Sequence, residues 1–256
     1  MLTQSSIIVI ALVAANALAF LIEMTAPRTA VYLFGLVPQL IRQRFCLWQF
    51  ITYMFLHGSF WHLFFNMFAL FIFGRDVAAA WGTKKFAAYY FFTGIGAGIC
   101  AFIFTNVPTI GASGAIYALL LAYGIMFPNR TILLYFFFPM KAKYLVVVFG
   151  IFELFASIAG NTDGIAHIAH LGGMAFGAIF LFFSRWLKRR YRKHEDNRFI
   201  EFKMPRPKED ADVDRLLDKI LRSGIESLTA QEKAILVRAG KFFAGHTSGS
   251  DARQKR

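Results

Sequence analysis

The sequence predicts an all-α membrane protein, with a bundle of six transmembrane helices followed by a short soluble helical tail. Three observations lead to this fold class. Of the 256 residues, 57% are hydrophobic and 31 are phenylalanine, and the mean hydropathy is +0.51, which is too apolar for a soluble globular domain. The apolar residues fall into six separate runs. The charged residues are concentrated after the last of these runs.

This uneven charge divides the chain into two parts. Residues 1–187 hold ten of the 28 basic residues and four of the 15 acidic ones. We therefore expect a membrane domain over residues 1–187 and a basic cytoplasmic tail over 188–256. The net charge of +13 does not indicate a nucleic-acid partner, because the basic run 188–193 directly follows an apolar span, as a membrane anchor does. The expected partner of this surface is the lipid bilayer.

The six expected spans, in chain order, are residues 7–22, 50–73, 86–104, 113–127, 144–158 and 165–187. Residues 24–50 are too polar to cross lipid and too aromatic for a plain linker, so we expect amphipathic interfacial structure there. The connections after the second and fourth spans are basic, as is the tail, whereas those after the third and fifth are not. The positive-inside rule then predicts that both termini are cytoplasmic.

A short turn, Gly111-Ala112-Ser113-Gly114, leads directly into the fourth span. Ser113 would lie at a helix N-terminus, where unpaired backbone N–H groups carry partial positive charge and could hold an oxyanion. The span from Ser113 to Phe127 covers about 22 Å, against about 30 Å of hydrocarbon. The backbone before Ser113 must then line a wet cavity, because lipid cannot satisfy its hydrogen-bonding groups.

Polar residues within spans are candidates for chemistry. His170, Gly173 and Gly177 share one face of the sixth span, and small residues recur at fourfold spacing in the fourth span from Gly114 onward. Such residues let two helix backbones approach closely, so Ser113 could meet His170. An imidazole that takes the hydroxyl proton makes serine a usable nucleophile. No acid has suitable spacing for a triad, so a Ser–His dyad is expected.

Further polar groups could support this pair. Tyr117, one turn after Ser113, could stack on the imidazole and orient it without a carboxylate. His62 and Asn66 share one face of the second span, where they supply either neutral donors for an oxyanion or hydrogen bonds between helices. His167 is interpreted as a support for the neighbouring base.

Four other residues receive no catalytic role. His57 is expected to order the first long connection. Glu153 is expected to be paired or to face a cavity. Cys46 and Cys100 have neither disulfide nor metal-site spacing. No metal or organic cofactor is expected.

Together these residues resemble the rhomboid intramembrane serine proteases over roughly residues 40–185. The shared pattern is His62-x-x-x-Asn66, then Gly111-Ala112-Ser113-Gly114 with Tyr117, then Ala169-His170-x-x-Gly173-x-x-x-Gly177. The resemblance implies that Ser113 is the nucleophile and His170 the general base. It also implies that His62, Asn66 and the backbone of Ser113 stabilise the oxyanion. It also implies cleavage of transmembrane protein substrates near the outer end of their spans, in a prokaryotic plasma membrane.

One departure from the family pattern is Trp48-Gln49, where the family often carries Trp-Arg. This departure concerns the anchoring of the first long connection and not the chemistry. An alternative function is a catalytically silent rhomboid-like protein that binds or escorts membrane-protein clients. A transporter that uses Asp163 and Glu153 is disfavoured, because inverted repeats and facing acids are not detected. The oligomeric state stays open.

The tail is expected to form a helical hairpin over about residues 209–239. An apolar stripe in residues 210–222 predicts the first helix. Thr229 and Glu232 have the spacing of a capping box that opens the second. Residues from His246 onward are expected to be disordered. The hairpin is either a solvated tail or a docking element.

Overall fold

The computed structural model describes residues 4–134, 138–159, 166–201 and 208–247. The chain divides into two compact units, residues 1–187 and 188–256. The elements are α1 (Gln4–Glu23), α2 (Pro27–Phe34), α3 (Pro38–Arg44), α4 (Gln49–Thr52), the 3₁₀ turn η1 (Tyr53–Phe55), α5 (Phe60–Trp81), α6 (Thr83–Phe104), α7 (Ser113–Met126), β1 (Thr131–Leu134), β2 (Phe138–Lys141), α8 (Ala142–Ala159), α9 (His167–Glu201), α10 (Lys208–Ser223), η2 (Ile225–Ser227) and α11 (Ala230–Thr247). The turn predicted around Asp163 and residues 248–256 lie outside the described residues.

Most of these helices have the length and composition of membrane spans. Within the described residues, five are long and apolar enough to cross a bilayer, namely α1 from Ser6, α5, α6, α8, and α9 as far as Leu187. The apolar helix α7 is shorter, with 14 residues. The predicted fold class, an all-α membrane protein with a helical tail, is confirmed. The chain is therefore an integral multi-pass membrane protein.

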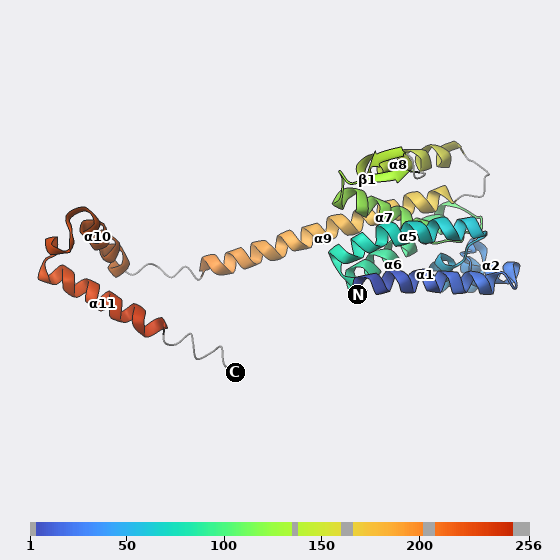
Figure 1. Ribbon diagram of the computed structural model, residues 1–256. Helices are drawn as coiled ribbons and strands as arrows, with labels where there is room; N and C mark the ends of the chain where they lie inside the picture. Colours follow the sequence, from blue (N-terminus) through green and yellow to red (C-terminus); the bar gives the residue numbers. More distant parts are fainter. Residues whose placement is uncertain (1–3, 135–137, 160–165, 202–207, 248–256) are drawn as a thin grey trace. The chain divides into compact units, whose positions relative to one another are not determined.

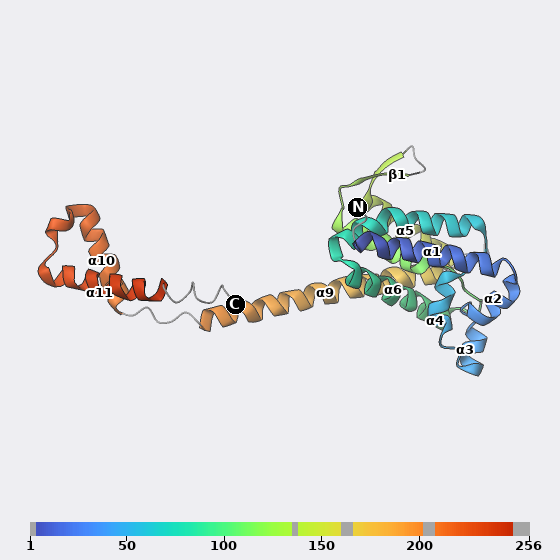
Figure 2. The ribbon, with the colours of Figure 1, turned by 60° about the horizontal axis from the view of Figure 1, so that its bottom comes forward.

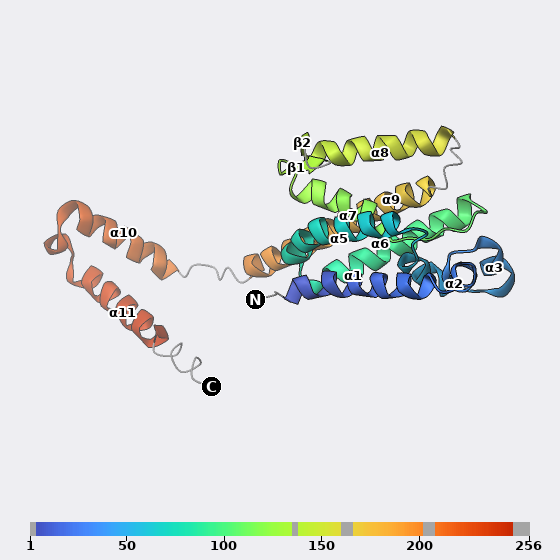
Figure 3. The same ribbon diagram turned by 45° about the vertical axis from the view of Figure 1, so that its right-hand side comes forward.

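The long helices of the first unit lie side by side in one bundle (Figure 1 and Figure 3). Helix α8 lies at one edge of this bundle (Figure 3), and α1 runs alongside α5 (Figure 2). Helices α2 and α3 lie at one end, and the two strands lie at the opposite end (Figure 1 and Figure 3). The interfacial structure predicted for residues 24–50 thus consists of short helices at one end of the bundle.

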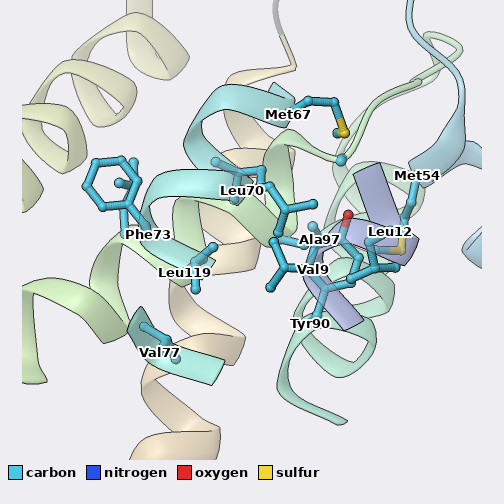
Figure 4. Packing of buried hydrophobic residues seen from close by; sticks show 14 of the residues in the cluster. Val9, Leu12, Met54, Met67, Leu70, Phe73, Val77, Tyr90, Ala97 and Leu119 are labelled. Atoms are coloured by element: carbon cyan, nitrogen blue, oxygen red, sulfur yellow. The ribbon is translucent and has the colours of Figure 1, made fainter. Parts of the chain in front are cut away.

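Close packing of apolar side chains joins the helices of the bundle (Figure 4). Val9 and Leu12 of α1 lie next to Tyr90 of α6, and Leu70 and Phe73 of α5 belong to the same cluster of buried side chains. Lipid is as apolar as these side chains, so the helices gain stability from dispersion contacts and hydrogen bonds rather than from leaving water. The fit between helices is therefore what positions the polar groups described below.

The second span begins later than the sequence predicted. Its predicted range was 50–73, whereas α5 begins at Phe60, and the preceding residues form α4 and η1. The cause is a helix cap, because the hydroxyl of Ser59 accepts a hydrogen bond from the backbone N–H of His62 at 3.1 Å. Hydropathy alone does not separate the short apolar helix α4 from the span that follows it.

The same helix also ends later than predicted. Residues 74–76 were expected in a polar connection, but α5 continues through them to Trp81. Asp76 is accommodated in the helix because it forms an ion pair with Arg130. The turn to α6 is made by Gly82, whose φ of +79° favours a residue without a side chain.

The connection after α7 contains a β-hairpin that the sequence analysis did not predict. Strands β1 and β2 pair antiparallel, with Thr131 opposite Lys141 and Leu134 opposite Phe138. Apolar residues occupy both strands without clear alternation, so their pattern carried little signal for a strand.

In the second unit, α10 and α11 form the helices predicted for the tail. The capping box is confirmed, because the N–H of Thr229 donates to Glu232 Oε2 at 2.8 Å and the N–H of Glu232 donates to Thr229 Oγ1 at 3.3 Å. The Lys219 ammonium lies 2.9 Å from the Glu232 carboxylate and holds its pKa at about 2. Residues from His246 onward were predicted to be disordered. Helix α11 continues to Thr247, so this prediction is wrong for His246 and Thr247.

Candidate active site

The turn that precedes Ser113 is braced by the first long connection. Leu36 and Thr109 form an antiparallel bridge with N–H···O distances of 3.0 and 2.9 Å. The N–H of Gly111 donates to the carbonyl of Tyr53 at 2.8 Å. These bonds satisfy backbone groups that lipid could not satisfy, and they fix the position at which α7 begins.

Gln49 anchors this connection in place of the arginine that the family often has. Its side chain is fully buried, its Oε1 accepts the N–H of Val37 at 3.0 Å, and its Nε2 donates to the carbonyl of Tyr32 at 3.0 Å. The indole N–H of Trp48 donates to the carbonyl of Leu33 at 2.9 Å. A neutral amide thus pairs with backbone groups here, and the departure from the family pattern leaves the connection anchored.

Small residues bring α7 and α9 into close contact, as their spacing predicted. A Cβ on Gly173 would lie 2.0 Å from the carbonyl oxygen of Gly114. A Cβ on Gly114 would lie 3.3 Å from the carbonyl oxygen of Ala169 on α9, and one on Gly177 would lie 3.1 Å from the Cβ of Ala118 on α7. At Gly173 the obstacle is a backbone atom, so a larger residue does not fit there without moving a helix.

This contact brings Ser113 and His170 together. The distance between Ser113 Oγ and His170 Nε2 is 2.7 Å, which is hydrogen-bond distance. His170 is 6% exposed, and the ring of Tyr117 stacks on it with a centroid distance of 4.3 Å and an interplanar angle of 11°. The stacking limits rotation of the imidazole, so its nitrogen stays directed at the hydroxyl.

His62 and Asn66 lie with this pair around one cavity of about 650 Å³. The side-chain amide of Asn66 donates one hydrogen bond to the His62 carbonyl at 2.8 Å, which leaves its second N–H for another acceptor. Gly111 has a φ of +115°, and a Cβ there would lie 2.8 Å from the His62 ring. The ring of His62 is thus packed directly on the turn that carries the serine.

The sequence analysis missed an acid next to the imidazole. Glu153 of α8 is 1% exposed, and its Oε1 lies 3.0 Å from His170 Nδ1 while its Oε2 lies 2.6 Å from His167 Nδ1. The contact with His170 is short but is not aligned as an ideal hydrogen bond. The expectation that Glu153 is paired is confirmed. The statement that no acid has suitable spacing for a triad did not anticipate this contact, because spacing along the chain does not show which face of α8 meets α9. One feature of the sequence did point to Glu153, because a single carboxylate in an otherwise apolar span is expected to have a polar partner or a function.

The three side chains Glu153, His167 and His170 also have the composition of a metal site, with ligand atoms within 4.8 Å of one another. Tetrahedral zinc ligands at their usual bond lengths lie about 3.3 Å apart. The carboxylate–imidazole distances of 2.6 and 3.0 Å are shorter than this. The geometry therefore fits direct pairing of the carboxylate with the two imidazoles.

His57 lies at the end of the first long connection, next to the site. Its backbone N–H donates to Glu23 Oε2 at 2.8 Å, and its ring meets the ring of His62 edge-on with a centroid distance of 5.0 Å. The ring is fully buried, and no hydrogen-bond partner for its nitrogens is found among the described residues. Burial, and secondarily the neighbouring His62, lowers the pKa of His57 to about 4.

Comparison with known proteins places the chain in a family. The family model "Rhomboid domain" matches residues 44–186, and a second one, a family of unknown function (DUF6576), matches residues 196–241. Similar proteins include the mitochondrial Rhomboid protein 1 of Saccharomyces cerevisiae, with 32% identity over 49% of this chain and 38% of that protein. Rhomboid protease GluP of Bacillus subtilis has 33% identity over 52% of this chain and 26% of its own length.

A third relative, the mitochondrial RHOMBOID-like protein 12 of Arabidopsis thaliana, is 30% identical over 50% of this chain and 44% of that protein. The matches thus cover less than half of the length of each of these three relatives. The match to the rhomboid domain covers more than half of this chain, and it includes every residue of the candidate site. The resemblance predicted from sequence is confirmed, and the chain belongs to the rhomboid family.

Proposed function

We propose that this protein is an intramembrane serine endopeptidase, with Ser113 as nucleophile and His170 as general base. The observation that carries the proposal is the 2.7 Å distance between Ser113 Oγ and His170 Nε2 at the wall of a cavity that is large enough for an extended peptide segment. A hydroxyl paired with a buried imidazole is the arrangement that activates serine in hydrolases on many unrelated folds.

The proposed reaction has two steps. Ser113 Oγ attacks the scissile carbonyl carbon, and its proton passes to His170 Nε2. The resulting imidazolium donates this proton to the departing amine as the peptide bond breaks and an ester forms on Ser113. Water then attacks the ester, with the imidazole again taking a proton and returning it to the serine oxygen.

Developing negative charge on the carbonyl oxygen needs donors that are already in place. We assign this role to the backbone N–H of Ser113 at the start of α7, to the free N–H of the Asn66 amide and to the ring of His62. All three lie around the same cavity. Gly111, Gly114, Gly173 and Gly177 support the site by allowing close approach, while Tyr117 orients the imidazole.

The proposed substrates are transmembrane proteins whose spans are cut near the outer end of the membrane. The name of Rhomboid protease GluP, a relative, supports proteolysis. We propose in addition that both termini lie on the cytoplasmic side, on the strength of the distribution of basic residues. The relatives include mitochondrial proteins, so the comparisons do not favour a prokaryotic plasma membrane over an organelle membrane.

The test is cleavage of a reporter span by the purified protein in lipid vesicles. The reporter carries small, helix-weak residues near the outer end of its transmembrane segment. We expect cleavage by the native chain and none by Ser113→Ala. Cleavage by the variant at the native rate would refute the proposal. Binding of the reporter without cleavage by either protein would favour the alternative of a silent client-binding protein.

A further inference from the structure

A single buried carboxylate connects two histidine side chains of the site. Glu153 lies on α8, His167 and His170 lie on α9, and Tyr117 lies on α7. The carboxylate contacts both imidazoles through Nδ1, and the ring of Tyr117 stacks on one of them, that of His170. A carboxylate that is 1% exposed in a membrane span costs free energy unless polar partners surround it, and the two imidazoles are these partners.

The contact with His170 bears on the chemistry of the proposed dyad. For His170 to take the Ser113 proton, Nε2 must be unprotonated, and Nδ1 must then carry the ring proton of the neutral imidazole. An acceptor next to Nδ1 favours this tautomer, and a negative acceptor also stabilises the imidazolium that forms during catalysis. Glu153 Oε1 lies at that position, 3.0 Å from Nδ1.

We propose that Glu153 is a positioning residue that fixes the tautomer and orientation of His170, so that the pair of Ser113 and His170 works with a carboxylate behind its base. This inference rests on the proposed proteolytic function. Resting-state hydrogen bonds of catalytic groups are often poorly aligned and tighten when substrate binds. The poor alignment of the contact between Glu153 and His170 is therefore compatible with a positioning role for Glu153.

The opposing interpretation is that Glu153 only joins α8 to α9. Its shorter contact, at 2.6 Å, is with His167, whereas the imidazole paired with Ser113 is that of His170. On that interpretation the removal of the charge would lower stability without changing the protonation of His170. The groups that face His170 are Ser113 and Tyr117 on α7, His62 on α5, and Glu153, so only Glu153 supplies a negative acceptor among the described residues.

The tautomer can be measured by NMR on protein labelled with ¹⁵N-histidine in lipid bilayers. The His170 signals are assigned by their loss in His170→Ala. We expect a protonated Nδ1 and an unprotonated Nε2 in the native chain, and loss of this preference in Glu153→Gln. We also expect kcat for reporter cleavage to fall about 10²-fold or more in Glu153→Gln, with KM changed by no more than about twofold. Glu153→Asp, which keeps the charge, should recover part of kcat.

Glu23→Gln is the matched control, because Glu23 is also buried in a membrane helix but accepts from the His57 backbone and not from His170. It should lower thermal stability while leaving the His170 tautomer unchanged. An Nε2-protonated His170 in the native chain would overturn the inference, as would an unchanged tautomer and kcat in Glu153→Gln. The tautomer measurement needs no turnover, so it decides the role of Glu153 separately from a failure of the native chain to cleave.

Discussion

A few side chains of the candidate site are held in one orientation by the residues around them. Tyr117 stacks on His170, the His62 ring packs against Gly111, and the Glu153 carboxylate bridges two imidazoles. Ser113, His170, His62 and Asn66 could be predicted from sequence because each stands in a short motif with a chemical reason. The contacts of Glu153 with the imidazoles could not be predicted, because they depend on which face of one helix packs against another.

The pH dependence of stability should contain a contribution from His57. Its pKa is about 4 in the folded protein and about 6.5 in an unfolded chain, so between these values the unfolded state binds more protons. The contribution of the neutral His57 ring to the free energy of unfolding is thus fully present above about pH 6.5. It is lost as the pH falls toward about 4. His57→Phe should therefore lose less stability than the native chain between pH 7 and pH 5, as measured by thermal unfolding in detergent. Equal losses would contradict the pKa argument.

The helices place these groups because small residues let their axes come close. The spacing of Gly114, Gly173 and Gly177 predicted this packing from sequence, and the carbonyl of Gly114 occupies the space that a Cβ on Gly173 would need. The limits of α5 were not predictable from hydropathy. A serine cap decides where it begins, and an ion pair with Arg130, which lies beyond α7, lets it continue past Asp76.

A methyl group at the contact between α7 and α9 should be costly. Gly173→Ala should destabilise the protein by about 1–3 kcal/mol, because a backbone atom and not a flexible side chain must move. It should also lower reporter cleavage by separating the serine from its base. Gly150→Ala on α8 is the control, because its new Cβ would meet only the end of the Met174 side chain, at 3.3 Å. Comparable unfolding midpoints for the two variants would show that the close contact is not needed.

The molecule combines a rhomboid domain with a charged segment that has its own helices. The division into a membrane part and a tail could be proposed from charge alone, because lipid excludes the residues that the tail contains. The hairpin β1–β2 could not be predicted, since its strands carry no alternating pattern. The second family match, over residues 196–241, begins beyond the apolar part of α9.

The distribution of basic residues predicts the orientation of the chain in the membrane. We expect both termini on the same side of the membrane, together with the connections after α5 and α7. Reporter enzymes that are active on only one side of the membrane, fused in turn to each terminus, measure this directly. Opposite activities at the two ends would require an odd number of crossings and would remove α7 or another helix from the set of spans.

The central claim is that the Ser113 hydroxyl is activated by the His170 imidazole. A fluorophosphonate probe reacts with activated serines and leaves an adduct that peptide mass spectrometry can locate. We predict one adduct per chain, on Ser113, abolished in His170→Ala and unchanged in Ser184→Ala, which removes a half-buried serine elsewhere on α9. An unmodified Ser113 in the folded native chain, or equal labelling in the His170 variant, would contradict the account.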